Sequence, residues 1–451
     1  MTVSAGRSLA LAVVGRVRER SSYAHETLAG ALAASSLSAQ DTAFATRLAY
    51  GTVACRGTLD EVVDRFTDAP KRLEPTVRDA LVIGAYELLF MRTPVWAAVD
   101  EGVELVRTVR PRAAGLANAV LRRIGERRDA FPWGDPATDR DALARLHGHP
   151  RWVVDLLIAD LGRSRAAEVI AANNEPAPLY LAHLPQGGSL NNAVATLEED
   201  GAVPALCDPP GCIVASRPSA AVRGRAVREL LVVVCDAGAQ FAARAVRARG
   251  GQRIVDVGSG RGTKALIMQG NAIASDGPAT ILAVDDHAFK LEVLRSVADL
   301  SHTPGIATLE FDATEISAEN LPFPTADAAL VDAPCSGLGT LRRHPDKRWR
   351  LMPSDVDALA GLGLRLLERA ALLVGPNGFV VYSTCTLTRA ENDDVVAEFL
   401  EGPAGEGFVL DSLDGEVPET WKRFVRPDGT FQSLPEPGGP DGHFVARMRR
   451  L

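Results

Sequence analysis

Five short apolar runs in the second half of the chain constrain its fold most strongly. They lie at 254–257, 281–285, 308–311, 328–332 and 380–382, and helix-length segments separate them. Strands that alternate with helices in this way predict a doubly wound, largely parallel sheet. Ligands of such sheets bind outside the carboxyl ends of the strands. We therefore expect a Rossmann-like α/β domain whose site residues directly follow these runs.

The residues that follow the first three runs have the chemistry of a nucleotide site. A glycine-rich segment follows the first run, and its glycines would let the backbone approach a ligand closely. Asp285 ends the second run, where an acid binds ribose hydroxyls, and Asp312 follows the third, where it could accept from an adenine amine. The Gly-x-Gly-x-Gly spacing differs from the dinucleotide pattern Gly-x-Gly-x-x-Gly, which disfavours NAD. The segment consists of Gly258, Ser259, Gly260, Arg261, Gly262, Thr263 and Lys264.

Two cysteines follow the fourth and fifth runs. Cys335 ends the sequence Asp-Ala-Pro-Cys that begins at Asp332, and Cys385 ends the sequence Tyr-Ser-Thr-Cys. A single cysteine at a strand end is commonly a small buried hydrophobic residue. Two of them in matching positions instead indicate one active site, in which a thiolate can act as a covalent nucleophile.

The rest of the chain reads as two further domains. Residues 8–128 carry apolar positions at helical spacing and no catalytic constellation. Prolines and a glycine at 131–139 indicate a linker. The segment that follows, to about residue 234, has signals for short strands and no chemistry of its own. We expect three domains, a helical one at 1–130, a small connecting α/β domain at 140–234 and the Rossmann-like domain at 235–451.

Composition limits the location and partners of the protein. No apolar run approaches the roughly 20 residues that span a bilayer, and the amino terminus lacks a signal pattern, so we expect a cytoplasmic protein. The six cysteines include no Cys-x-x-Cys pair, which argues against a disulfide framework and predicts no metal site. The net charge of −8 disfavours nucleic acid, but arginines cluster at 107–128 and 342–350 and could bind RNA locally. The sequence does not show an oligomeric state, and a monomer is assumed.

Several separated segments resemble known families. Four segments of the helical part resemble the NusB family of RNA-binding helical domains. The segments around the two cysteines resemble the Sun family of RNA cytosine-5 methyltransferases, and with the helical part they resemble the bacterial 16S ribosomal RNA methyltransferase B group. The matching segments are 47–53, 86–89, 98–105 and 117–123 for NusB, and 236–240, 332–337, 342–346, 383–386 and 391–392 for the methyltransferases.

The resemblance implies an S-adenosylmethionine-dependent enzyme that forms 5-methylcytosine, with 16S ribosomal RNA as the expected substrate. It implies Cys385 as the nucleophile and Cys335 as the cysteine that aids product release. DNA cytosine methyltransferases place their nucleophile in a Pro-Cys pair, so the reverse assignment stays open. The implied cofactor contacts are residues 258–264, Asp285, Asp312 and Asp332, and Asp332 could also face the cytosine.

The glycine segment departs from the family pattern Cys-Ala-Ala-Pro-Gly-Gly-Lys. Arg261 stands in place of the proline and Thr263 in place of one glycine. The result is closer to the general glycine loop of class I methyltransferases, so we expect cofactor binding to persist.

The basic segment after Cys335 would ordinarily be a solvated charged loop. Beside an active site, its charges and a tryptophan predict phosphate contact and packing against a base or ribose. His344 could also act as a general base, although its proline-flanked loop favours RNA contact or turn structure. Two alternatives remain, a catalytically weak RNA-binding or antitermination factor and a transfer RNA cytosine-5 methyltransferase. The predicted RNA-binding residues are Arg342, Arg343, His344, Lys347, Arg348 and Trp349.

Overall fold

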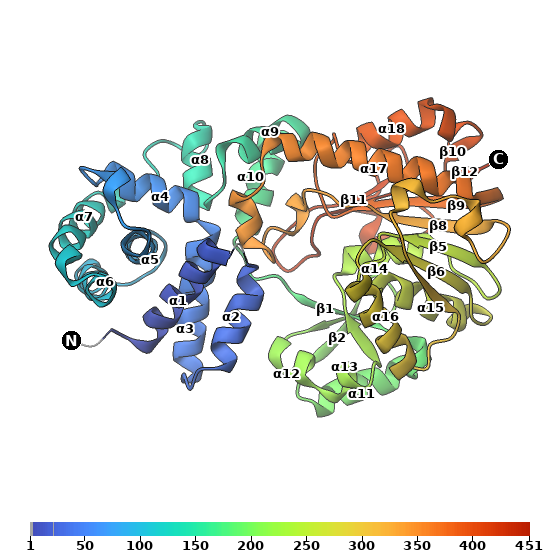
Figure 1. The fold of residues 1–451 in the computed structure, drawn as a ribbon, viewed down its shortest axis with the longest axis horizontal. Coiled ribbons are helices and arrows are strands. Elements are labelled where there is room, and N and C mark those ends of the chain that lie inside the picture. Colours follow the sequence, from blue (N-terminus) through green and yellow to red (C-terminus); the bar gives the residue numbers. More distant parts are fainter. Residues whose placement is uncertain (1–2, 21) are drawn as a thin grey trace. The chain divides into compact units, whose positions relative to one another are not determined.

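The computed structural model describes residues 3–20 and 22–451, and the chain divides into two compact units (Figure 1). The helical unit comprises residues 1–175 together with the segment 341–351, and the sheet unit comprises 176–340 and 352–451. This division differs from the three expected domains. The helices within 140–172 group with the amino-terminal helices, and the small connecting sheet groups with the large sheet.

The helical unit, in which helices were predicted, is built around one almost completely buried helix, α5. Two acidic residues of α5 are buried and each is neutralised by arginines, because an unpaired buried charge is costly. Asp79 accepts from Arg18 at 2.8 Å and from Arg56 at 2.7 Å, and Glu87 accepts from Arg7. The helices are α1 (Ala5–Arg20), α2 (Ala24–Ala33), α3 (Ala39–Ala54), α4 (Arg56–Arg65), α5 (Pro75–Phe90), α6 (Val95–Val109), α7 (Ala114–Glu126), α8 (Arg140–His147), α9 (Arg151–Leu161) and α10 (Arg163–Ala172).

The connecting region forms a four-stranded antiparallel sheet in the order β2-β3-β1-β4. Short strands were predicted for this region, and the structure contains four of them. One face of this sheet and the helices that connect its strands enclose a small apolar core. The elements are β1 (Leu179–His183), α11 (Leu190–Glu199), β2 (Pro204–Cys207), β3 (Cys212–Ala215), α12 (Pro218–Arg223), α13 (Arg225–Arg228) and β4 (Val232–Val234).

The large sheet confirms the predicted fold class. All five apolar runs are strands, and they pair in parallel in the order β9-β8-β5-β6-β7. Next to β9 lies β12, which is antiparallel to β9 and to β10 and also pairs with β11. The strands are β5 (Arg253–Val257), β6 (Thr280–Asp285), β7 (Ile306–Glu310), β8 (Ala326–Asp332), β9 (Val374–Thr384), β10 (Phe408–Leu410), β11 (Phe431–Ser433) and β12 (His443–Arg450).

Helices cover both faces of the large sheet (Figure 1). Successive strand side chains point to opposite faces, so Ile254 joins one apolar core while Val255 and Val257 join the other. The chain crosses from β7 over β6 and β5 to reach β8, which makes the carboxyl ends of β5 and β8 a topological switch point. The covering helices are α14 (Ala237–Ala245), α15 (Thr263–Ser275), α16 (Ala288–Leu300), α17 (Pro353–Leu373) and α18 (Asp393–Glu401).

Among the described residues, no helix is both long enough and apolar enough to cross a membrane.

Candidate active site

The glycine segment forms a loop between β5 and α15. The backbone N–H groups of Gly258 and Ser259 both donate to Val284 O at 3.0 Å. Gly258, Gly260 and Gly262 all have positive φ, which side chains rarely tolerate. A Cβ on Gly258 would lie 2.7 Å from the carbonyl oxygen of Asp332, whereas one on Gly260 would meet no atom within 4 Å. The loop therefore packs closely against the end of β8 at Gly258, whereas the space next to Gly260 is open.

Asp285 holds this loop against the end of β6. Its carboxylate accepts from the backbone N–H of Gly260 at 2.9 Å and of His287 at 3.0 Å, and Lys290 Nζ lies 3.2 Å away. Asp285 is buried at the strand end where the sequence predicted it. The structure therefore brings the predicted glycine loop and the predicted ribose acid into direct contact.

Asp312 follows β7, the next strand of the sheet. Its carboxylate accepts from Thr314 through the backbone N–H at 2.9 Å and through the hydroxyl at 2.7 Å. These two hydrogen bonds lower the pKa of Asp312. The acid that was predicted for the adenine side is thus ionised and fixed at the same edge of the sheet.

Lys264 and Asp332 form an ion pair between α15 and the end of β8. The distance from Lys264 Nζ to Asp332 Oδ2 is 2.6 Å. Burial disfavours the charged form of Lys264, but the nearby Asp332 carboxylate outweighs it and raises the pKa of the lysine. Two residues predicted for the site are therefore joined at the switch point of the sheet.

Asp256, the penultimate residue of β5, is a site candidate that the motif search missed. It is 0% exposed, and neither of its carboxylate oxygens makes a well-formed hydrogen bond to a described residue. Burial raises the pKa of Asp256 to about 7. The hydroxyl of Ser259, in the loop beside it, is also buried without a well-formed hydrogen bond to a described residue, and its interaction with the Asp256 carboxylate offsets only part of the rise in pKa. The sequence signal for Asp256 was the presence of an acidic residue within the otherwise apolar run 254–257.

Cys335 and Cys385 lie side by side, as their positions after adjacent strands predicted. β8 and β9 pair in parallel with Asp332 opposite Ser383. The two Sγ atoms are 3.4 Å apart, and the backbone N–H of Cys385 donates to Cys335 Sγ at 3.3 Å. The hydrogen bond to Cys385, together with burial, raises the pKa of Cys335 well above that of an ordinary thiol. Because thiolate is the nucleophilic form of cysteine, this environment keeps Cys335 a neutral and weakly nucleophilic thiol.

The basic segment 341–351 is part of the helical unit, and two of the predicted RNA contacts, Arg348 and Trp349, make hydrogen bonds to that unit. Arg348 is 1% exposed. Its guanidinium donates to Asn173 O at 2.6 Å, to Asn174 Oδ1 at 2.8 Å, and to the carbonyl oxygens of His147 and Gly148 at 3.3 Å. A guanidinium that is buried and bonded in this way holds the fold of the helical unit and cannot also contact a phosphate.

Trp349 is also committed to packing within the helical unit. Its Nε1 donates to Ala54 O at 2.8 Å, and its ring lies where a Cβ on Gly57 would be. These contacts occupy part of the Trp349 side chain, and its packing against a base stays a prediction. Among the other predicted contacts, Arg342 is buried, and Arg343, His344 and Lys347 are half-buried.

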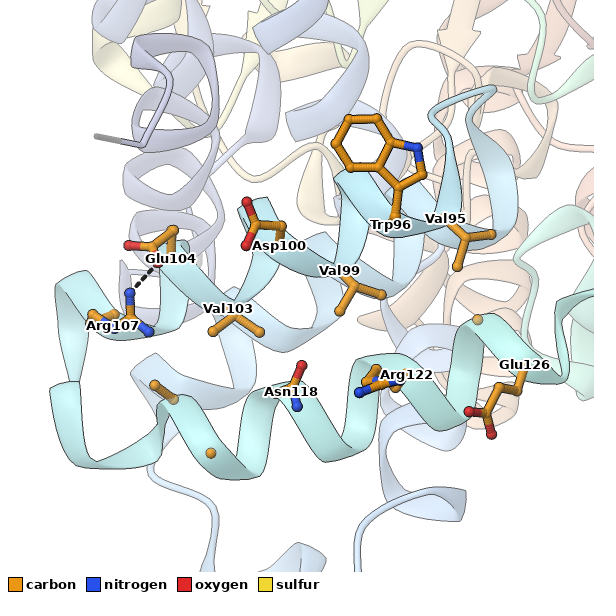
Figure 2. A pocket seen from close by; sticks show the side chains of 13 residues that line it. Val95, Trp96, Val99, Asp100, Val103, Glu104, Arg107, Asn118, Arg122 and Glu126 are labelled. Carbon is orange, nitrogen blue, oxygen red and sulfur yellow. Dashed lines mark hydrogen bonds and ion pairs between the residues drawn. The ribbon is translucent and has the colours of Figure 1, made fainter. Parts of the chain in front are cut away.

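The helical unit also contains a groove between α6 and α7, with a volume of about 860 Å³. In Figure 2, Val99 and Val103 of α6 face Asn118 and Arg122 of α7 across it. The exposed Trp96 lies at one end of the groove. None of the predicted site residues lines this groove, so it is separate from the cysteine and glycine-loop motifs.

Comparisons with known proteins agree with this geometry. The family model of 16S rRNA methyltransferase RsmB/F matches residues 243–449, and that of the NusB family matches residues 4–126. The ribosomal RNA small subunit methyltransferase B of Thermus thermophilus is 30% identical, over 100% of this chain and 99% of the relative. That of Vibrio cholerae is 31% identical, over 80% of this chain and 82% of the relative.

Solved structures show the same fold. The crystal structure of PH0851 matches with a TM-score of 0.81 at 21% identity, over 99% of this chain and 98% of that one. A methyltransferase homolog from Pyrococcus horikoshii matches with a TM-score of 0.57 at 21% identity, over 68% of this chain and 98% of that one. With the full-length relatives and the two family matches, the conclusion is that the chain belongs to the RsmB/F family of RNA methyltransferases and carries an amino-terminal NusB domain.

Proposed function

We propose that this protein transfers a methyl group from S-adenosylmethionine to carbon 5 of a cytosine in 16S ribosomal RNA, through a covalent adduct with Cys385. The observation that carries the proposal is the pair of cysteine sulfurs 3.4 Å apart, on loops that follow adjacent parallel strands. Full-length relatives named ribosomal RNA small subunit methyltransferase B support the choice of RNA.

The glycine loop fits the cofactor. Gly260 faces open space, and the buried polar atoms of Asp256 and Ser259 make no well-formed hydrogen bond to a described residue, so a polar ligand would satisfy them. S-adenosylmethionine, when bound, supplies an electrophilic methyl group on a sulfonium. We assign its contacts to residues 258–264 and to Asp256, with Asp285 for the ribose, Asp312 for the adenine amine and Asp332 beside them.

The departures from the family loop leave this fit intact. Arg261 is exposed, and Thr263 is the first residue of α15 and has no atom within 4 Å of a Cβ built on Gly260. The conformations that the loop requires are provided by Gly258, Gly260 and Gly262.

The cysteines supply the covalent chemistry. Carbon 5 of cytosine is a poor nucleophile, so the Cys385 thiolate first forms a bond to carbon 6, and the electrons of the 5,6 double bond move to carbon 5. Carbon 5 uses this electron pair to accept the methyl group. A base then removes the carbon 5 proton, the pair left behind restores the double bond, and the sulfur–carbon bond breaks to return the thiolate. The neutral thiol of Cys335, adjacent to Cys385 Sγ, stabilises the departing sulfur by hydrogen bonding.

The RNA partner is supported by exposed arginines on and around α6 and α7 of the NusB domain. Phosphate contacts of this kind position RNA without reading its sequence. We propose that this surface holds the substrate while the sheet unit modifies a base turned out of its stack. The arginines are Arg107, Arg110, Arg112, Arg122, Arg123 and Arg127.

The test compares wild type with Cys385→Ala and Cys335→Ala. Each protein is incubated with S-adenosylmethionine and unmodified small-subunit RNA, with transfer RNA as a parallel substrate, and then run on denaturing gels. We expect methyl transfer by the wild type and a covalent protein–RNA band that accumulates in Cys335→Ala alone. The band in Cys385→Ala instead would reverse the two roles. Transfer to transfer RNA only would overturn the substrate, and no transfer to either RNA would favour a binding factor.

A further inference from the structure

A buried carboxylate, Glu391, lies between the two cysteine-bearing loops. It is 1% exposed. Its Oε1 accepts from the backbone N–H of Ser336 at 2.6 Å, and its Oε2 accepts from the hydroxyls of Ser336 at 2.6 Å, Thr388 at 2.8 Å and Thr386 at 3.1 Å. A carboxylate can accept all of these hydrogen bonds at once.

Two of these partners are the immediate neighbours of the cysteines. Ser336 follows Cys335 and Thr386 follows Cys385, and their hydroxyl oxygens are 2.7 Å apart. Glu391 therefore joins the loop after β8 to the loop after β9, one residue beyond each thiol. The sequence search quoted Glu391 only as part of a resembling motif and gave it no role.

The next residue, Asn392, fixes the second loop from the other side. Its Oδ1 accepts from Thr384 Oγ1 at 2.6 Å, and its Nδ2 donates to Thr386 O at 3.2 Å. Cys385 thus lies between two residues that are both bound to the start of α18. Because Asn392 fixes the loop that carries Cys385, the hydrogen bonds from Ser336 to Glu391 determine the position of Cys335 relative to Cys385.

We propose that Glu391 is a positioning residue that sets the separation of the two thiols, and so enables Cys335 to assist the release of the methylated base. The inference rests on the proposed function, because release by a second cysteine belongs to that reaction. Glu391 does not touch the substrate in this account. It acts through its hydrogen bonds to Ser336 and Thr386. Without these bonds the two cysteine-bearing loops would separate, and Cys335 would lie too far from the departing sulfur.

The first experiment measures turnover and adduct for Glu391→Gln, which keeps the shape but replaces one acceptor oxygen by a donor. Tyr382→Phe is the matched control, since Tyr382 is equally buried and its hydroxyl donates to the backbone oxygen of Glu391 at 2.8 Å. We expect kcat to fall about 10- to 100-fold in Glu391→Gln, the scale of a misplacement of about 1 Å. The KM for RNA should stay within twofold, and adduct should accumulate as in Cys335→Ala.

A double variant separates positioning from a general loss of structure. If Glu391 acts through Cys335, adding Glu391→Gln to Cys335→Ala should not change the rate of release further. Additive losses, or a Glu391→Gln enzyme with wild-type kcat and no adduct, would overturn the proposal. Ser336→Ala removes one hydroxyl link and should show the same pattern more weakly, which covers the case in which Glu391→Gln does not fold.

A second experiment needs no RNA, and so distinguishes failure of this inference from failure of the proposed function. Phenylarsine oxide condenses with two neighbouring thiols and releases water, so its affinity reports how closely they are held. The protein carries Cys207→Ala, because Cys207 and Cys212 form another cross-strand pair. We expect at least tenfold weaker binding in Glu391→Gln and unchanged binding in Tyr382→Phe. Equal affinity in all three proteins would refute the positioning role even if methyl transfer is observed.

Discussion

Replacing Arg348 by methionine should destabilise the helical unit, although Arg348 looks like a surface residue in the sequence. The side chain is fully buried in a segment that follows the Cys335 loop, and its four acceptors are on residues 147–148 and 173–174. Methionine has a similar length and no donors, so the substitution removes the hydrogen bonds without leaving a large cavity.

The magnitude follows from the two short hydrogen bonds, to Asn173 O and Asn174 Oδ1. A hydrogen bond to a charged group contributes about 1.5–3 kcal/mol. The two bonds at 3.3 Å leave from the same nitrogen and contribute little. Burial lowers the pKa of Arg348 to about 10, which shows that the charge itself is disfavoured there, and losing it offsets part of the cost. We expect a net loss of about 3 kcal/mol for methionine, and about 5 kcal/mol for alanine because of the added cavity.

Hydrogen–deuterium exchange is the assay of choice, because it resolves the helical unit from the sheet unit within one chain. Peptides from residues 140–175 should exchange faster in Arg348→Met, while those from the large sheet should not change. Arg112→Met is the control, since Arg112 is an exposed arginine of the same unit. Unchanged exchange at residues 140–175, or an equal effect in Arg112→Met, would refute the assigned role.

Three further predictions concern other sites. Gly57→Ala should lower the free energy of unfolding by about 1–3 kcal/mol in chemical denaturation, because the new methyl group overlaps the Trp349 ring. Lys264→Met should weaken S-adenosylmethionine binding at least tenfold in calorimetry, since Asp332 loses the cation that holds it. Asp256→Asn should remove the part of the pH dependence of the free energy of unfolding that comes from the titration of Asp256. The folded wild type retains a proton between about pH 4 and pH 7 that the unfolded chain releases, so its stability falls as the pH rises through this window. At pH 8 the variant should be the more stable protein, by at most about 4 kcal/mol.

Each of these predictions has a control and a contradicting result. Gly115→Ala adds a methyl group where no atom lies within 4 Å, and it should not destabilise. If Gly57→Ala also leaves the free energy of unfolding unchanged, the new methyl group does not overlap the Trp349 ring. Lys422→Met removes an exposed lysine of the sheet unit and should leave cofactor affinity unchanged. Parallel stability curves of wild type and Asp256→Asn from pH 4 to pH 8 would show that Asp256 titrates normally.

The large sheet could be predicted because its signal is local. Each of the five apolar runs carries its own strand signal, and the rule that parallel strands end at one edge brings their trailing residues together. That rule alone placed Cys335 beside Cys385 and Asp285 beside the glycine loop. The antiparallel strand β12 was not predicted, because it lies in a tail that reads as charged and pairs with β9 about 60 residues earlier.

Arg348 was misread because its partners are far away in the sequence. Nothing near residue 348 shows that a guanidinium there meets backbone carbonyls 175 to 201 positions earlier. A charged run next to an active-site motif is read as a ligand-binding segment when the residues that pack against it cannot be identified from the sequence. Asp256 was missed for the opposite reason, since an apolar run draws attention to its hydrophobic residues and not to the single acid among them.

The placement of Arg348 also has a consequence for how the protein is made. Residues up to 175 leave the ribosome first, yet the donor for Gly148 and Asn173 comes from a segment synthesised much later. At about 5–20 residues per second, the intervening 173 residues take roughly 9–35 s. Through that interval the acceptor oxygens of residues 147–148 and 173–174 lack this donor, so the helical unit can be completed only after about three quarters of the chain has been synthesised.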